Sequence, residues 1–237
     1  MRLDKFIADS TELTRSLAAK AVKQKRVLVN GERPRTASLQ VSEEDCITLD
    51  GEVLTLNTAL RYFVMNKPQG YICANRDSVN PLVFDLLTGV TKKQNLHTVG
   101  RLDLDTSGLL FITDDGQWSH QLTSPRRKIA KTYRAWLAED LAPNAEERFK
   151  EGVLLEDDLV PTLPAELERI NEREVLLTIY EGRYHQVKRM FGALGNAVTK
   201  LHRERIGGLT LNELNLKEGE FRDLTDAELE KLARNSL

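Results

Sequence analysis

The apolar run Leu109-Leu110-Phe111-Ile112 is the part of this sequence that most restricts how the chain folds. Gly108 precedes the run and Asp114-Asp115-Gly116 follows it closely, and a short apolar run between such residues is typical of a buried strand. This strand would leave Asp103 on the loop that leads into it. Because the end of a rigid strand holds its neighbours in place, Asp103 is the first candidate for a reactive carboxylate.

The size and composition of the chain fit a soluble globular protein with one sizeable domain and a smaller one. Its 237 residues are 41% hydrophobic, without a charged leader or an apolar stretch of the about 18 residues that a membrane span needs. We therefore expect a cytoplasmic protein that has no membrane partner. Cys46 and Cys73 are far apart and lack histidines at metal-ligand spacing, so we expect two small buried residues rather than a disulfide or a zinc site.

Charge is distributed unevenly along the chain, although the net charge is only -2. Residues 1–35, 122–134 and 182–208 each have a net charge of +5, whereas residues 137–181 have a net charge of -9. Three basic segments that meet on one face would neutralise phosphates, which favours a nucleic acid as the partner. Solvated faces of ordinary helices are the other explanation of such clusters.

Residues 1–58 are predicted to form a small domain of two helices and short hairpins. The first helix is indicated by three apolar residues at helical spacing: Leu3, Phe6 and Ile7. Thr14 can cap a second helix, whose inner face would consist of Leu17, Ala18, Ala21 and Val22. Turns are expected at Asn30-Gly31 and Asp50-Gly51, because these residues favour positive φ angles. The strands beside them would be Val27–Val29, Cys46–Leu49 and Val53–Leu56.

Residues 59–237 are predicted to form a larger domain, after a linker at Asn57-Thr58-Ala59-Leu60. Strands are expected at 62–65, 71–74, 109–113, 131–137, 164–170, 174–180 and 208–211. Helices are expected near 116–123, 143–151, 185–195 and 225–234. Thr225 and Glu228 would give the last helix a capping box. The pattern indicates an α+β fold whose sheet is mainly antiparallel.

Four stretches of the chain resemble the motifs of RNA pseudouridine synthases. They are, in order, Met65–Tyr71 (MNKPQGY), Gly100–Leu110 (GRLDLDTSGLL), Lys131–Tyr133 (KTY) and Glu181–Met190 (EGRYHQVKRM). The opening Arg-Leu-Asp-Lys and the later Val-Asn-Gly are similar to an S4 RNA-binding module, with a dimerisation or packing domain as the alternative. The resemblance covers nearly the whole chain. It implies a small S4-like domain followed by a catalytic domain with a mixed, mainly antiparallel sheet and an active-site cleft.

The resemblance also implies a reaction, the isomerisation of uridine to pseudouridine. It is closest to the branch of the family that acts on uridine 516 of 16S rRNA, either free or in an assembling small ribosomal subunit. Asp103 would act as the nucleophile on a flipped-out base, at C6 of the base or at C1′ of the ribose. Tyr133 would stack on that base, unless it only packs in the core. Lys188 would pair with Asp103, with Arg189 as the alternative partner.

The remaining candidate site residues are predicted contacts to RNA. In the first domain these are Arg2, Lys5, Arg15, Lys20, Lys23 and Arg26. In the second domain they are Arg101, Arg126, Arg127, Lys131, Arg183, His185, Gln186, Arg189 and Arg203. We expect no cofactor and no metal, because a carboxylate nucleophile needs neither and because Asp105, Asp114 and Asp115 lack the spacing of a metal site. We also expect the protein to act as a monomer.

Two other functions fit parts of the pattern. A catalytically inactive rRNA-binding or ribosome-assembly factor would keep the S4-like domain and change no base. A metal-dependent nuclease built on the aspartates would cleave RNA in a reaction that EDTA stops. The presence together of Asp103, Tyr133 and a cation at position 188 favours the isomerase over both.

Overall fold

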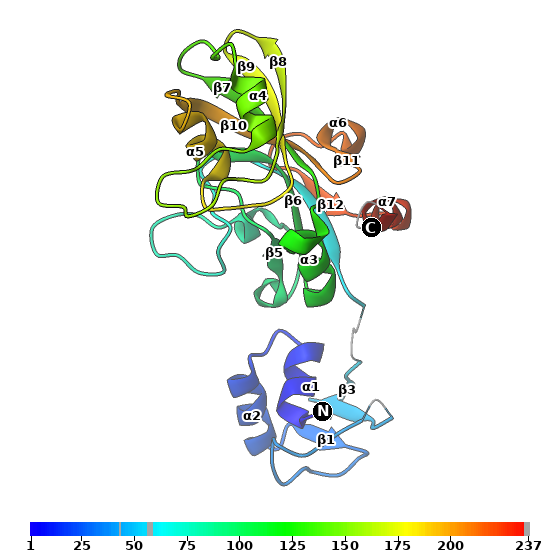
Figure 1. Ribbon diagram of the computed structural model, residues 1–237. Coiled ribbons are helices and arrows are strands. Elements are labelled where there is room, and N and C mark those ends of the chain that lie inside the picture. Colours follow the sequence, from blue (N-terminus) through cyan, green and yellow to red (C-terminus); the bar gives the residue numbers. More distant parts are fainter. Residues whose placement is uncertain (43, 56–58, 235–237) are drawn as a thin grey trace. The chain divides into compact units, whose positions relative to one another are not determined.

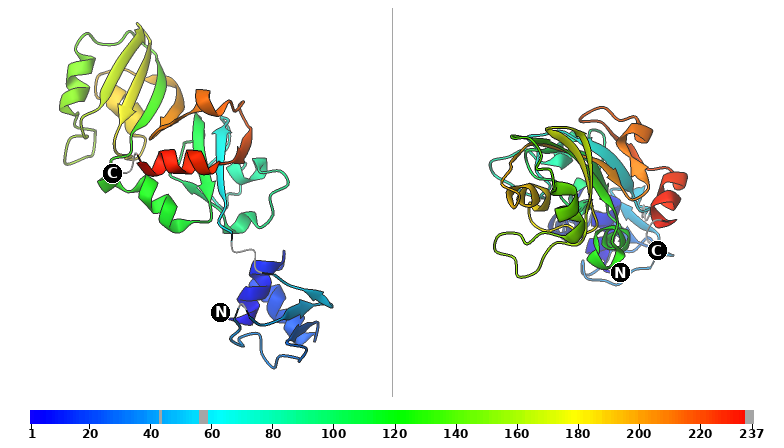
Figure 2. Two further views of the ribbon diagram at one scale, coloured as in Figure 1. Left: turned by 90° about the vertical axis from the view of Figure 1, so that its right-hand side faces the viewer. Right: turned by 45° about the horizontal axis from the view of Figure 1, so that its top comes forward.

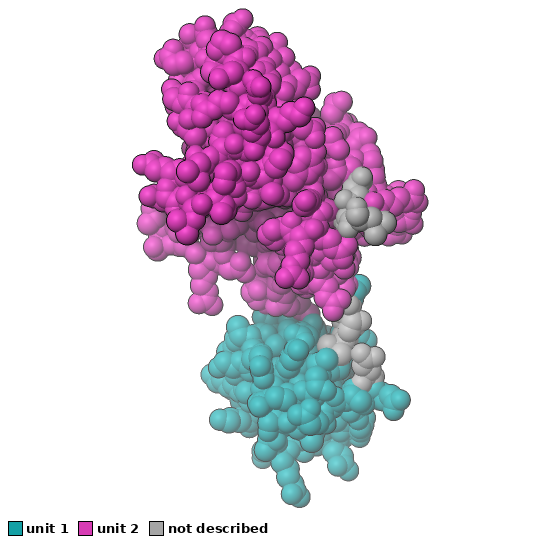
Figure 3. Space-filling view, viewed as in Figure 1, with its two compact units in different colours: residues 1–59 teal, residues 60–237 magenta. Residues whose placement is uncertain are grey.

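The computed structural model describes residues 1–42, 44–55 and 59–234. The chain divides into two compact units, Met1–Ala59 and Leu60–Leu237, which have different colours in Figure 3. Residues 57 and 58 of the predicted linker lie outside the described residues. None of the helices in the described ranges has the length and the apolar character that a bilayer span requires.

The first unit packs two helices against a small antiparallel sheet (Figure 1). Its elements are α1 (Leu3–Ser10), α2 (Arg15–Lys23), β1 (Val27–Val29), β2 (Ile47–Leu49) and β3 (Glu52–Val53). Thr14 caps α2, since its Oγ1 accepts a hydrogen bond from the amide of Leu17 at 3.3 Å. The core contains the predicted residues of both helices except Leu17, which is exposed because it lies about 100° around the helix from Ala18.

Both predicted turns of this unit have the expected backbone. The φ angles are 52° and 82° at Asn30-Gly31, and 53° and 89° at Asp50-Gly51. Asp50-Gly51 joins β2 to β3 in a hairpin. Asn30-Gly31 closes only a single bridge from Val29 to Glu32, and β1 pairs with β2 instead. The prediction for the cysteines is half right, because Cys73 is buried whereas Cys46 is exposed.

The second unit is built on a mixed sheet. Its strands are β4 (Tyr62–Lys67), β5 (His97–Val99), β6 (Thr106–Thr113), β7 (Lys131–Leu137), β8 (Glu166–Asn171), β9 (Glu174–Ile179), β10 (Val198–Ile206), β11 (Leu209–Thr210) and β12 (Phe221–Asp223). The order along the sheet is β12-β4-β6-β10-β7-β9-β8, with β5 paired to β6 and β11 paired to β10. Among the strands of the described residues only β6 and β10 run parallel, so the predicted mainly antiparallel sheet is confirmed.

Helices cover both faces of this sheet (Figures 1 and 2). They are α3 (Gly116–Thr123), α4 (Ala145–Glu151), α5 (Gln186–Gly192), α6 (Leu211–Leu214) and α7 (Asp226–Arg234), with 3-10 turns at Val83–Leu86, Lys93–Asn95 and Pro125–Arg127. One hydrophobic core contains residues of α4 and α5, and a second core contains residues of α3, α6 and α7. Leu110 and Ile112 of β6 lie in the first core, and Leu109 and Phe111 lie in the second. The buried strand predicted from the apolar run is therefore confirmed.

Gly108 allows β6 to approach β10 closely. Its φ angle is +113°, and a Cβ atom at this position would lie 2.3 Å from the backbone oxygen of Arg203 in β10. No side chain fits at such a distance, so glycine is required here for steric as well as conformational reasons. The end of β6 that follows Asp103 is thus packed directly on the backbone of Arg203.

The strand predicted at 208–211 is shorter in the structure, where β11 is Leu209–Thr210, and two larger differences concern other strands. β10 was not predicted, although it lies in the middle of the sheet between β6 and β7. Its central residues Lys200–Arg205 contain one leucine among charged and polar side chains, so the apolar alternation of a strand is missing. The strand expected at 71–74 is absent, because Ile72 makes only one bridge, to Leu82. By contrast, the last helix begins as predicted, and Thr225 and Glu228 exchange the hydrogen bonds of a capping box.

Candidate active site

Asp103 lies on the loop between β5 and β6, as predicted, and its side chain is 34% exposed. The turn that follows β4 fixes the backbone of this loop. The amide of Gly70 donates to the carbonyl of Leu104 at 2.7 Å, and Nε2 of Gln69 donates to the carbonyl of Asp105 at 2.8 Å. The carboxylate of Asp103 therefore projects from a loop whose own position is fixed.

Lys67, the last residue of β4, holds the same loop from inside the protein. Its side chain is 0% exposed, and its Nζ donates to the carbonyl oxygens of Pro68 (3.0 Å), Asp103 (3.1 Å) and Thr106 (2.7 Å). Burial lowers the pKa of Lys67 below its ordinary value, while the nearby charge of Asp103 acts in the opposite direction. Lys67 was not among the predicted site residues. The available signal was a lysine at the end of an apolar strand, directly before a proline.

Two side chains at the start of α5 face the carboxylate of Asp103. Nε2 of His185 lies 3.4 Å from Oδ1, and Nζ of Lys188 lies 3.6 Å from Oδ2. Lys188 is hydrogen-bonded more closely to both oxygens of Asp105, at 2.6 and 2.8 Å. These bonds lower the pKa of Asp105, against the effect of its partial burial. Of the two candidate cations, Lys188 rather than Arg189 is the one that reaches Asp103.

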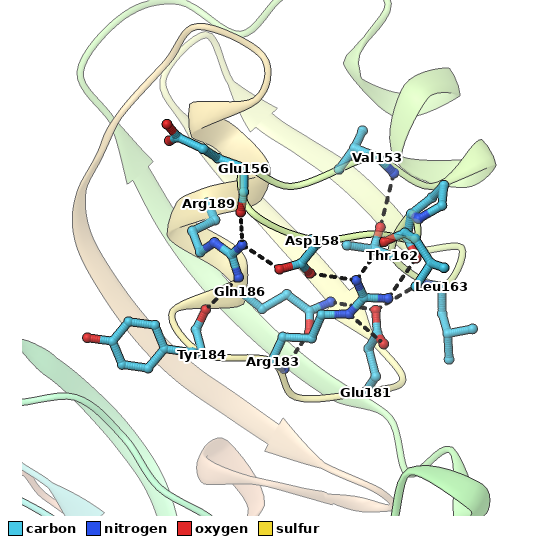
Figure 4. Close-up of polar contacts among 12 residues, drawn as sticks. Val153, Glu156, Asp158, Thr162, Leu163, Glu181, Arg183, Tyr184, Gln186 and Arg189 are labelled. Carbon is cyan, nitrogen blue, oxygen red and sulfur yellow. Dashed lines mark hydrogen bonds and ion pairs between the residues drawn. The ribbon is translucent and has the colours of Figure 1, made fainter.

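Arg189 belongs to a separate ion network around Asp158 (Figure 4). Its Nη2 lies 2.6 Å from Oδ1 of Asp158 and also donates to the carbonyl of Glu156, and Nη1 of Arg183 lies 2.7 Å from Oδ2 of Asp158. Hydrogen bonds from Arg183 and then from Arg189 lower the pKa of Asp158. Because the two arginines flank the start of α5, the network ties the loop before β8 to the segment that faces Asp103.

Gln186 completes this network from a buried position. Its Oε1 accepts from the amide of Arg183 at 2.8 Å, and its Nε2 donates to Glu181 at 3.0 Å. Arg183 also donates to Glu181 and to the carbonyls of residues 160 and 161. Gln186 is therefore not exposed on the open surface, and its contact with RNA stays a prediction. The side chains of Arg183 and Arg189 form ion pairs within the protein, and their contacts with RNA stay predictions.

The carboxylate of Asp103 opens onto a cavity of about 590 Å³, a volume typical of small-ligand sites. Tyr133 from β7 lines this cavity together with Arg203 from β10, and the exposed Arg101 lines it as well. The ring of Tyr133 is largely buried. Nη1 of Arg203 donates to its hydroxyl at 3.3 Å, and the guanidinium carbon lies 5.8 Å from the ring centre. Asp103, Tyr133 and Lys188, the predicted nucleophile, aromatic ring and cation, therefore line the same cavity.

Two further cations of the cavity are not free surface groups. Arg203 is 2% exposed and its Nε donates to the carbonyl of Leu109 at 2.8 Å, so the predicted contact of Arg203 with RNA cannot be a contact on the open surface. Lys131 donates to the carbonyl of Ile129 at 3.1 Å. Burial, assisted by the charge of Arg203, lowers the pKa of Lys131 to about 8. Both side chains make the inside of the cavity electropositive.

The other predicted RNA contacts are exposed on their units. In the second unit these are Arg126 and Arg127, and in the first unit they are Arg2, Lys5, Arg15, Lys20, Lys23 and Arg26. Arg2 and Arg15 share Asp4 as a partner, at 2.8 and 3.1 Å. Because Asp4 is buried and one acid serves two arginines, the exposed surface here stays positive.

The aspartates that follow β6 bind other groups of the protein. Asp114 binds Arg61 at 2.7 Å, and Asp115 caps α3 by accepting from the amides of Gln117 and Trp118. Within the described ranges of the chain, no group of three or more His, Cys, Asp or Glu side chains is arranged to hold a metal ion.

Comparison with known proteins assigns the family. Residues 61–193 match the model of the RNA pseudouridylate synthase family, and residues 1–47 match the model of the S4 domain. The chain belongs to the RNA pseudouridylate synthase family. It is therefore an RNA-modifying isomerase, and the S4-like beginning of the synthase, predicted from its first residues, is confirmed.

Relatives of the synthase match it over nearly its full length. Ribosomal small subunit pseudouridine synthase A from Haemophilus influenzae is 49% identical over 234 residues, which are 99% of this chain and 100% of that protein. The protein of the same name from Escherichia coli strain K12 is 48% identical over 229 residues, which are 97% of this chain and 98% of that protein. A crystal structure described as a pseudouridylate synthase is 49% identical, covers 98% of this chain and 99% of its own, and has a TM-score of 0.70. The predicted architecture of the synthase is therefore confirmed.

Proposed function

We propose that this synthase converts one uridine of 16S rRNA, uridine 516, to pseudouridine. The choice of small-subunit rRNA rests on relatives that are named ribosomal small subunit pseudouridine synthase A and match 97% to 99% of this chain. The electropositive cavity and the exposed cations of the first unit suit an RNA substrate.

The observation that carries the chemistry is the partly exposed carboxylate of Asp103, which lies within 3.6 Å of Lys188 at the edge of the cavity. Uridine and pseudouridine are isomers, so the reaction needs no redox partner. Asp103 forms a bond to C1′ of the ribose or to C6 of the base, and the bond from N1 to C1′ breaks with its electron pair on the base. The base turns, C5 bonds to C1′, and the bond to Asp103 breaks. The proton on C5 is lost to water, and N1 takes up a proton from water, so that the product is an isomer of uridine.

The neighbours of Asp103 support this part of the reaction. Lys188 orients the carboxylate of Asp103 from 3.6 Å, and the hydrogen bonds to Asp105 hold the ammonium in place. Tyr133 stacks on the extruded base, while Arg203 fixes the tyrosine through its hydroxyl. The basic helices of the first unit add affinity for folded rRNA by binding phosphates.

The proposal is tested with rRNA that carries tritium at uridine C5, supplied both as free 16S rRNA and as assembling small subunits. The wild-type chain should release the label, and the Asp103→Asn variant should release none above background. Asp140→Asn serves as the matched control, because Asp140 is exposed, binds Arg173 and does not line the cavity. Release by Asp103→Asn at the wild-type rate would remove Asp103 from the reaction. Mapping pseudouridine in rRNA from a strain that lacks the gene identifies the modified position.

A further inference from the structure

Tyr184 and His185 form a stacked pair of rings at the mouth of the cavity. Their ring centres are 3.8 Å apart and their planes differ by 20°. Both residues line the cavity together with Asp103. Tyr184 is nevertheless 76% exposed, which leaves most of its ring, apart from the face on His185, open to solvent.

The backbone that carries the pair is tied to its surroundings. Nη1 of Arg189 donates to the carbonyl of Tyr184 at 3.3 Å, and Figure 4 shows the ring of Tyr184 pointing away from the ion network that includes Arg189. His185 has a left-handed φ angle of 47° and directly precedes α5. Non-glycine residues adopt this conformation rarely, and they keep it where the surrounding structure enforces it. The backbone from which the exposed ring projects is thus set by the fold.

The His185 ring contacts Asp103 with its edge and Tyr184 with one of its faces. Nε2 at the edge of the His185 ring lies beside the carboxylate of Asp103, at 3.4 Å. Tyr184 covers one face of that ring, so a flat group on the open face of Tyr184 would lie two ring spacings from His185. A base on the open face of Tyr184 would thus be separated by the Tyr184 ring from the His185 ring that contacts Asp103.

We propose that Tyr184, supported by His185, is a stacking platform for an unpaired RNA base next to the target uridine. The proposal rests on the proposed function, because it requires a nucleotide bound at Asp103. Exposed aromatic rings beside a positively charged groove bind successive bases of single strands, because every base has a π-face. Nothing in the pair reads the edge of a base, so the platform accepts any of the four bases. It keeps the neighbouring nucleotide in place while the target uridine is out of its stack.

The test uses the full-length chain with Asp103→Asn, so that bound RNA stays unmodified. Tyr184→Ala, Tyr184→Trp and the control Leu159→Ala are added to this background. Leu159 is 98% exposed and does not line the cavity. The probes are 16S rRNA transcripts with 2-aminopurine at the nucleotide on either side of uridine 516, and with 2-aminopurine in place of this uridine. The measurements are the dissociation constant and the quenching of the probe, which reports stacking on a ring.

Removal of the tyrosine ring should weaken RNA binding by about 5- to 150-fold, the range measured for loss of one base-aromatic stack. Tyr184→Ala should also abolish quenching at one neighbouring position, whereas Tyr184→Trp and Leu159→Ala should keep both properties. In chains with Asp103 intact, Tyr184→Ala should raise KM for the transcript and leave kcat nearly unchanged.

Unchanged affinity and unchanged quenching in Tyr184→Ala would overturn the platform. Quenching by the parent protein that occurs only with the probe at the target position, or at no position, would overturn it as well. Binding is measured without catalysis, so the two proposals can fail separately. If the wild-type chain released no tritium but Tyr184→Ala still lost affinity and quenching, the proposed reaction would be wrong and the platform would stand.

Discussion

Gly108→Ala adds one methyl group to the second unit, and we expect it to be strongly destabilising. The new Cβ atom would lie 2.3 Å from the oxygen and 2.5 Å from the nitrogen of the Arg203 backbone. Both atoms belong to a central strand and cannot rotate away as a flexible side chain could. β6 and β10 would therefore have to separate, and this would disturb the buried residues on both faces of β6.

The expected loss is the sum of two effects. Overpacking of a well-packed core costs about 1–3 kcal/mol. The φ angle of +113° is unfavourable for alanine and costs about 1–3 kcal/mol more. We therefore expect the free energy of unfolding to fall by about 4 kcal/mol, a large part of the total stability of about 5–15 kcal/mol that is usual for a protein.

Urea unfolding followed by tryptophan fluorescence measures this loss in the second unit alone, because both tryptophans of the chain, Trp118 and Trp136, lie in it. The midpoint should fall by about 2 M for a denaturant dependence of about 2 kcal/mol per molar urea. Gly116→Ala is the control, because Gly116 begins α3 and its added Cβ would meet no atom within 4 Å. It should change stability by less than about 1 kcal/mol. Equal midpoints for the two variants would refute the role of Gly108 in the approach of the strands.

Two further substitutions test the buried lysines. Lys67→Met leaves three backbone carbonyls without their donor and also removes a buried charge, so we expect a net loss of about 3 kcal/mol in the same urea assay. The variant protein that is still folded should also lose tritium release. Full activity of the folded variant would contradict the role of Lys67 in holding Asp103. Lys131 has a pKa of about 8 in the folded chain against an ordinary 10.5, so the unfolded chain binds more protons between these pH values. The stability of the wild type relative to Lys131→Met should therefore rise from pH 8 to pH 10.5, and a difference that does not change with pH would show that Lys131 is not desolvated.

The parts of the structure that could be predicted from the sequence are those with a local physical cause. The run at 109–112 is apolar at every position because β6 is buried on both faces. Thr225 and Glu228 sit at the spacing of a capping box, and Asp50-Gly51 has the residues that a tight turn requires. Asp103 could be placed on the loop before the strand for the same reason.

The remaining features depend on partners that are distant in the sequence. β10 contains charged residues whose side chains are buried by other elements or form ion pairs with them. Arg203 faces the cavity, while Glu204, on the other side of the strand, binds Arg134 of β7 at 2.5 Å. Lys67 is buried only because three carbonyl oxygens surround its ammonium. Two of them, on Asp103 and on the first residue of β6, lie more than thirty residues away. Arg183 and Arg189 belong to a matched motif, but their partner Asp158 lies in the acidic segment 137–181, where the charge pattern alone does not pair any one acid with a given arginine.

The position of β10 has a consequence for the order in which the chain folds on the ribosome. β6 and β7 are both synthesised before β10, which lies between them in the sheet. Neither strand can pair with β10 until residue 206 has left the exit tunnel. Until then each strand presents an unpaired edge, and such edges attract other chains. The cavity at Asp103 is lined by residues next to β6, on β7 and on β10. It is therefore complete only when most of the polypeptide has been synthesised. Nascent chains that stop before β10 would be inert and prone to aggregate.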